Sequence, residues 1–166
     1  MIKMECDGCT VCCKLIEIPW MDSPRGEYCK ECEPNVGCRI YDHAPEECLK
    51  FRCAYNQVPK CNINLRPDKL GIIFDKITDD VFIGTVNPDV LISEEAQKQV
   101  ALFVKEGFGV VLFNDKISKP MVFSPKGKNP REIWNEVLRI REFVVTEIQN
   151  ANIVIHKKFH LNGQVA

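Results

Sequence analysis

Residues 6–13 read CDGCTVCC, a stretch that places four cysteines in eight positions and makes two of them adjacent. The steps from Cys6 to Cys9 and from Cys9 to Cys12 have Cys-x-x-Cys spacing, which allows two thiolates to converge on one cation through a tight turn. Gly8 lets the backbone inside the first step bend so that its amides face the sulfurs. The stretch therefore predicts an N-terminal lobe that is organised by its cysteines.

The other cysteines also lie in the N-terminal part of the chain. All ten cysteines of the 166-residue chain lie within the first 61 residues. Prolines are spread through the same region and no apolar period is sustained, so we expect loops and short helical turns there. We divide the chain into a cysteine-rich lobe, residues 1–66, and a second lobe, residues 67–166.

The sequence of the second lobe contains segments that are typical of regular strands. Residues 70–77 and 81–86 are rich in Ile, Val and Phe and flank an Asp-Asp turn, which predicts a β-hairpin. Residues 110–113 and 120–123 predict a second pair of strands around a turn at Asn114-Asp115. A final strand or tail is expected near residues 153–160.

Two helices are expected between and after these strands. Ser93 is a candidate N-cap for a helix that ends near Glu106, before Gly107. Asn129 and Pro130 begin a longer helix that continues to about residue 150. The fold class is therefore α+β: a loop-dominated, cysteine-rich, metal-binding lobe packed on a small antiparallel sheet with two helices.

Bulk properties give little evidence for large charged partners. The formal net charge of −1 provides no basic surface for nucleic acid or for an anionic membrane. No apolar segment approaches the ~20 residues that span a bilayer, and the first residues do not resemble a secretion signal. We expect a cytoplasmic protein that binds a metal ion. A protein partner is the second candidate.

Three explanations of the cysteines differ in how well they fit a cytoplasmic protein. A disulfide framework conflicts with the reducing cytoplasm, and a bridge between Cys12 and Cys13 would need a distorted peptide. A thioredoxin-like site needs a strand before its Cys-x-x-Cys pair, and too few residues precede Cys6 to form one. Metal ligation explains more of the pattern, because the spacing recurs at Cys29 and Cys32.

Thiolates suit either tetrahedral zinc or an iron–sulfur cluster, and both stay open at this point. Because adjacent cysteines rarely ligate one ion together, Cys12 and Cys13 are expected to serve different metals or different corners of one cluster. The roles of His43 and Cys61 stay open. From spacing, the candidate metal ligands are Cys6, Cys9, Cys12, Cys13, Cys29 and Cys32.

The run CDGCTVCC, followed by GCRIYDHAPEECLKF at 37–51, resembles the YkgJ-like CxxCxxCC family, which is described as zinc- or iron-chelating. The resemblance covers about a third of the chain. Ala44 and Leu49 stand where the family has arginines, so an anion-binding role of those positions does not carry over. The matching positions are Cys6, Cys9, Cys12, Cys13, Cys38, Ile40, Tyr41, Pro45, Cys48, Phe51 and Cys53.

The resemblance adds Cys38, Cys48 and Cys53 to the candidate metal ligands. It implies metal binding more strongly than any reaction. The leading hypothesis is a cytosolic metal-binding protein with cysteine-ligated zinc, or with an iron–sulfur site. One alternative is a metal-dependent protein-modifying enzyme that uses the cluster in its active site, which requires an open coordination position. The other is a protein interaction module that the metal holds together.

Overall fold

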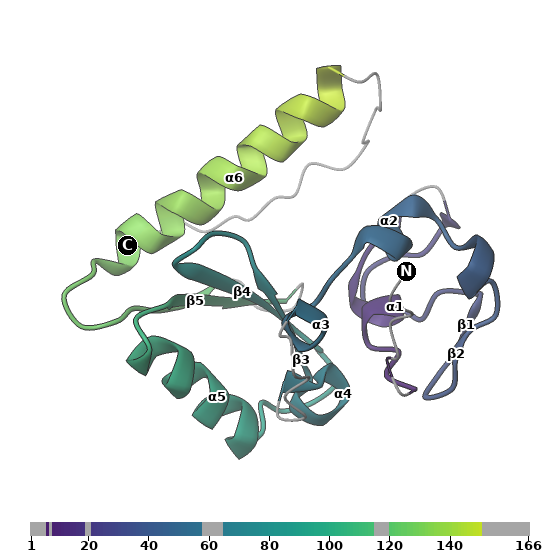
Figure 1. Cartoon of the computed structure of the whole chain (residues 1–166), viewed down its shortest axis with the longest axis horizontal. Coiled ribbons are helices and arrows are strands. Elements are labelled where there is room, and N and C mark those ends of the chain that lie inside the picture. Colours follow the sequence, from purple (N-terminus) through teal and green to yellow (C-terminus); the bar gives the residue numbers. More distant parts are fainter. Residues whose placement is uncertain (1–5, 7, 19–20, 58–64, 115–119, 151–166) are drawn as a thin grey trace.

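The computed structural model describes residues 6, 8–18, 21–57, 65–114 and 120–150, with only the backbone of 141–150 (Figure 1). Expectations for the Asn114-Asp115 turn beyond Asn114 and for the segment 153–160 fall outside the described residues. The described chain forms a cysteine-rich lobe beside a sheet that carries one helix on each face (Figure 1).

The cysteine-rich lobe consists of short elements joined by loops, as its prolines predict. Its longest helix has five residues and its strands have two each. In chain order its elements are α1 (Cys12–Leu15), β1 (Cys32–Glu33), β2 (Gly37–Cys38), η2 (Tyr41–His43), α2 (Glu46–Lys50) and α3 (Ala54–Gln57).

The second lobe contains the longer elements, and the α+β fold class is confirmed. A four-residue helix that the sequence reading did not anticipate comes first and ends at Gly71, whose φ of 68° suits a helix C-terminus. The elements are α4 (Pro67–Leu70), β3 (Ile72–Lys76), β4 (Val81–Val86), α5 (Glu94–Lys105), β5 (Gly109–Phe113), β6 (Met121–Phe123) and α6 (Pro130–Asn150).

The order of strands in the sheet is β3-β4-β5-β6. The two expected strand pairs, β3 with β4 and β5 with β6, are antiparallel. The expectation of a wholly antiparallel sheet is wrong, because β4 and β5 pair in parallel, with Val81 opposite Gly109. The reason is that α5 carries the chain back along the sheet, so β5 starts at the same end as β4.

Both expected helix starts are confirmed by side-chain caps. The Ser93 hydroxyl accepts a hydrogen bond from the Ala96 amide at 3.1 Å. The Asn129 side chain accepts one from the Arg131 amide at 3.0 Å. These caps satisfy amides that have no partner inside the first helical turn. None of the helices in the described part of the chain has the length and apolar character that a bilayer crossing requires.

The two long helices cover opposite faces of the sheet (Figure 1). Side chains alternate between faces along each strand. One face packs on α5 through the cluster that contains Ile72, Phe74, Val100, Val110 and Leu112. The other packs on α6 through Val81, Val111, Ile133, Trp134 and Val137.

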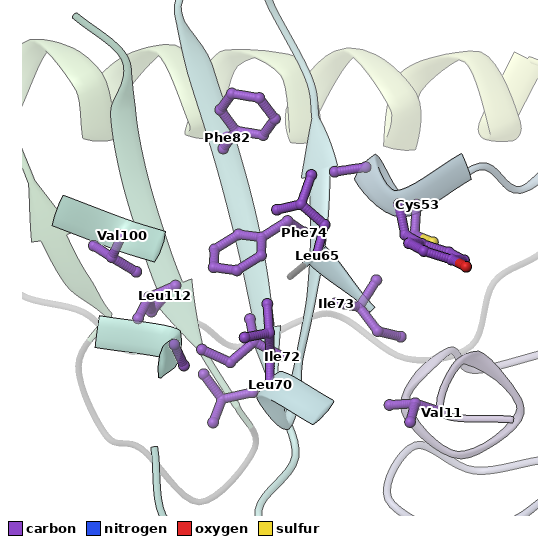
Figure 2. Packing of buried hydrophobic residues seen from close by; sticks show 14 of the residues in the cluster. Val11, Cys53, Leu65, Leu70, Ile72, Ile73, Phe74, Phe82, Val100 and Leu112 are labelled. Atoms are coloured by element: carbon purple, nitrogen blue, oxygen red, sulfur yellow. The ribbon is translucent and has the colours of Figure 1, made fainter. Parts of the chain in front are cut away.

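One apolar cluster continues from the sheet into the cysteine-rich lobe. Figure 2 shows Ile73 on the opposite side of β3 from Phe74, toward Cys53 and Val11. Leu15 and Tyr55 belong to the same cluster and are 1% and 4% exposed. The edge strand β3 therefore belongs to the packing of both lobes.

Polar contacts reinforce this junction. Lys14 on α1 forms an ion pair with Asp89 of the second lobe at 2.7 Å. The Arg25 guanidinium lies 5.8 Å from the ring centre of Phe113, within the range of a cation–π contact. Because both contacts join residues far apart in sequence, they fix the position of the cysteine-rich lobe against the sheet.

Candidate metal centre

The nine described cysteines gather around one cavity of about 100 Å³. No disulfide joins any of them. The sequence analysis proposed the same residues as ligands, and the structure brings all of them together. They are Cys6, Cys9, Cys12, Cys13, Cys29, Cys32, Cys38, Cys48 and Cys53.

The first Cys-x-x-Cys step forms the expected tight turn. The Cys9 amide donates a hydrogen bond to the Cys6 carbonyl at 2.7 Å. Gly8 has a φ of 76°, and a Cβ atom at this position would lie 2.7 Å from the carbonyl oxygen of Asn35. Only glycine satisfies both the left-handed backbone and this close approach.

Thr10 connects this turn to the neighbouring hairpin. Its hydroxyl accepts a hydrogen bond from the Asn35 amide at 3.0 Å, and its carbonyl accepts one from the Cys13 amide at 3.0 Å. The threonine is 3% exposed. The sequence analysis missed this residue, because its partner lies 25 positions away.

The adjacent cysteines face different surroundings. Successive helical residues project about 100° apart, and α1 begins at Cys12. Cys12 packs against the apolar cluster that reaches β3. The carbonyl of Cys13 accepts a hydrogen bond from the Cys29 amide at 2.8 Å, and its thiol interacts with that of Cys32. The doublet thus touches two sides of the cavity.

Short elements place the later cysteines. Cys32 and Cys38 lie opposite each other in the β1–β2 pair. Cys48 is on α2. The carbonyl of Cys53 accepts a hydrogen bond from the amide of Asn56, at 2.8 Å. The Asn56 side chain donates to the Cys6 sulfur at 3.6 Å, which joins the first cysteine to the last described one.

The rest of the cavity wall is mainly apolar. Tyr41 and Phe51, two of the positions that match the family pattern, both line it. Glu31 and Glu47 supply acidic side chains, whereas no Lys, Arg or His occurs among the described lining residues. A cation inside this wall would therefore find sulfur and carboxylate ligands without a competing positive charge.

Burial makes most of these thiols hard to ionise. Desolvation raises the pKa of Cys9 to about 11 and that of Cys48 to about 11. Burial also raises the pKa of Cys32 and of Cys53. At neutral pH these groups keep their protons, so a metal that binds them must displace protons, and its affinity must rise with pH.

Cys12 is the exception. A hydrogen bond from the Cys13 thiol lowers the pKa of Cys12 to about 7, and the same bond, together with burial, raises the pKa of Cys13. A negative charge on Cys12 in turn contributes to the raised pKa of Cys48. Cys12 thus ionises more readily than Cys9, Cys13 and Cys48.

The arrangement fits a thiolate-bound metal in donor chemistry. Sulfur ligands suit zinc and iron–sulfur clusters. As the side chains stand, no three of the described His, Cys, Asp or Glu residues surround a single point as ligands. The sulfurs are spread over the cavity wall, so ligation requires side-chain rotation toward the centre.

His43 lies on η2, is exposed, and does not line the cavity, as expected of a surface histidine. Cys61 lies outside the described residues. Sequence reasoning also missed Asn56, because an asparagine next to a short helix has no pattern that points to a distant sulfur.

Asp75 lies two positions after the cavity-lining Ile73 on β3 and accepts a hydrogen bond from Gln57 at 3.1 Å. Desolvation raises its pKa above the ordinary Asp value. The folded chain then holds the Asp75 proton more tightly than the unfolded chain does. Protonated Asp75 therefore contributes fully to the free energy of unfolding at low pH, and this contribution is lost as pH rises through the folded pKa.

We expect Asp75→Asn to increase the free energy of unfolding at pH 7, by about 1 kcal/mol or less. Asparagine keeps an oxygen acceptor for Gln57 and removes the charge. Urea unfolding at pH 7 and at pH 3 measures the effect, which should vanish at pH 3. Equal stabilisation at both pH values would contradict the electrostatic explanation, and Asp75→Ala is the control that removes the acceptor as well.

Comparison with known proteins adds no relative from which a role can be transferred: no family model, no curated protein and no solved structure matches this chain.

Proposed function

We propose that this is a cytoplasmic metal-binding protein whose cysteine-rich lobe holds zinc through thiolates, with an iron–sulfur cluster as the alternative occupant. One observation carries the proposal: nine cysteines line one cavity that has no cationic side chain among its described lining residues. The resemblance of residues 6–13 and 37–51 to the CxxCxxCC family supports the same assignment.

Different residues of the cavity have different roles in the proposed metal binding. The turn at Gly8 and the β1–β2 pair, which are in contact through Asn35, both place thiols in the cavity wall. Tyr41 and Phe51 exclude water, which strengthens electrostatic contacts inside the wall. A bound metal would supply a cross-link between segments that have few regular backbone hydrogen bonds.

The shared apolar cluster favours a structural role for such a metal. Val11, Leu15 and Cys53 pack with residues of β3, so a cross-link in the cavity also stabilises the junction between the lobes. A metal that holds the lobe together is therefore the form of the proposal that the packing supports best.

The experiment measures the metal content of protein purified under reducing conditions without added metal. We expect zinc or iron in stoichiometric amount by elemental analysis, and much less in Cys9→Ser, because this thiol lies at the first turn of the cavity wall. Colour separates the two occupants, since zinc thiolates are colourless and iron–sulfur clusters are brown.

Cys61→Ser is the matched control, because Cys61 lies outside the proposed ligand set. It should keep the metal content of the unmodified chain. A folded protein that contains no metal while its thiols are reduced would overturn the proposal, and loss of metal in Cys61→Ser would show that the ligand set is wrong.

A further inference from the structure

The β1–β2 hairpin places two cysteines directly across from each other. Cys32 on β1 is the register partner of Cys38 on β2, and the two strands are antiparallel. Residues that face each other in an antiparallel pair project from the same side of the ladder. Both cysteines line the cavity, so their side chains share the side that faces it.

The hydrogen bonds around this pair identify it as the closely spaced type. The Arg39 amide donates to the Glu31 carbonyl at 2.9 Å, one position outside the pair on each strand. The Cys32 amide donates to the Cys29 carbonyl at 2.9 Å. Cys32 and Cys38 are therefore a non-hydrogen-bonded pair, in which the Cα atoms lie about 4.5 Å apart. Disulfides have Cα separations of about 4.4–6.8 Å, so the backbone already meets this condition.

A tight turn holds the pair in position. The Val36 amide donates to the Glu33 carbonyl at 3.0 Å, and Asn35 between them has a φ of 63°. Pro34 at the second turn position and a left-handed residue at the third are typical of a type II turn. The Asn35 amide also donates to the Thr10 hydroxyl at 3.0 Å, which anchors the turn to the neighbouring segment. The hairpin is therefore fixed before any bond joins its cysteines.

We propose that Cys32 and Cys38 are a site of reversible oxidation, which a peroxide converts into a cross-strand disulfide. Residues 33–36 of the hairpin are exposed and Cys38 is half-buried, whereas Cys32 is 6% exposed. The peroxide therefore reaches Cys38 first. Disulfides in cytosolic proteins are usually transient and redox-sensing, and a bond that forms only on oxidation belongs to that class. The bond needs no metal, so this site is independent of the proposed function.

The reaction balances with the peroxide as its oxidant. The Cys38 sulfur attacks one peroxide oxygen, the O–O bond breaks, and the departing oxygen takes the thiol proton and leaves as water. This step gives a sulfenic acid at Cys38. The Cys32 sulfur then attacks the Cys38 sulfur, the S–O bond breaks, and a second water leaves with the Cys32 proton. Two thiols and one hydrogen peroxide become one disulfide and two waters, and an excess of a thiol reductant reverses the change.

The Cys13 thiol is the other close neighbour of Cys32. Cys13 belongs to α1, whereas Cys32 and Cys38 belong to one hairpin whose register is set by its own backbone. Rotation about the Cα–Cβ bonds brings the two hairpin sulfurs together, and we therefore expect the bond within the hairpin. Because this bond consumes two of the cavity thiols, the oxidised chain has fewer sulfur ligands for the proposed metal.

The test treats the full chain, purified under reducing conditions and then freed of reductant, with hydrogen peroxide. Free thiols are blocked by alkylation, and the chain is digested with trypsin without reduction. Cleavage after Lys30 and Arg39 releases residues 31–39, whose only cysteines are Cys32 and Cys38. We expect this peptide to escape alkylation and to be two hydrogen masses lighter than its reduced form. Dithiothreitol added before the alkylation should restore the alkylated peptide.

Two variants of the turn test the hairpin geometry without changing a thiol. Asn35→Gly accepts the left-handed backbone and should form the disulfide as readily as the unmodified chain. Asn35→Val opposes that backbone, because a β-branched residue is strained at positive φ, and should lower the yield of the lighter peptide several-fold. Equal yields from the two variants would overturn the role of the hairpin in placing the pair.

The mapped linkage decides the outcome in the unmodified chain. The proposed site would be overturned if the peptide 31–39 stays reduced, is oxidised only to sulfinic acid, or becomes linked to the peptide that contains Cys13. The metal content of the reduced protein is measured separately and tests the proposed function. Failure of the disulfide and failure of metal binding are therefore distinguishable.

Discussion

Under the proposed function, a chelator that removes the metal is expected to unfold the cysteine-rich lobe and to lower the melting temperature of the whole chain. Structural zinc sites contribute apparent binding free energies of about 10–16 kcal/mol in zinc-finger peptides at neutral pH. Several elements of this lobe have only two to five residues, and such elements are not stable alone. Under the proposed function, a bound metal would replace regular backbone structure as the source of cohesion.

Calorimetry and amide hydrogen exchange, with and without chelator, measure this effect. Amides of residues 8–57 should lose protection first, and those of β4 and β5 last, because the central strands are buried by helices on both faces. Addition of zinc should restore protection in the unmodified chain and much less in Cys9→Ser. Unchanged protection of the cysteine-rich lobe after metal removal would contradict the structural role.

Replacement of Phe74 by alanine is expected to cost about 3–5 kcal/mol of the free energy of unfolding, the range found for large-to-small substitutions in cores. Phe74 is 1% exposed, and its ring meets that of Phe103 on α5 edge-to-face, with centroids 5.2 Å apart.

Leu102→Ala is the matched control, because Leu102 is on α5 and is 46% exposed. It should cost well under 1 kcal/mol. Urea unfolding followed by tryptophan fluorescence and by circular dichroism measures both variants. Coincident transitions are expected for Phe74→Ala, since one apolar cluster includes residues of both lobes; separate transitions would show that the lobes unfold independently.

Local features of the second lobe were predictable from its sequence. The caps at Ser93 and Asn129 combine a side-chain acceptor with a helix-forming segment, and the first hairpin combines apolar strands with an acidic turn. The parallel pairing of β4 with β5 was not predicted, because strand patterns do not record direction. Direction depends on the path of α5, which is a tertiary property.

In the candidate site, too, local features were predictable from the sequence and contacts between distant segments were not. Cysteine spacing together with the family resemblance was enough to propose the nine residues that line one cavity. Contacts between distant segments were not accessible, because no periodicity links Thr10 to Asn35 or Asn56 to Cys6. The sequence predicted that the cysteine-rich lobe packs on the sheet, but it did not indicate that β3 shares one apolar cluster with that lobe.

The position of Ile73 in the cavity wall sets an order of events during synthesis. The cysteines at positions 6–53 leave the ribosome before Ile73, yet Ile73 lines their cavity and packs in the cluster with Cys53. Until β3 has emerged and paired with β4, that wall is missing and the thiols stay accessible. The nascent chain thus has an interval in which the cysteines are synthesised and the Ile73 part of their cavity wall is not yet in place.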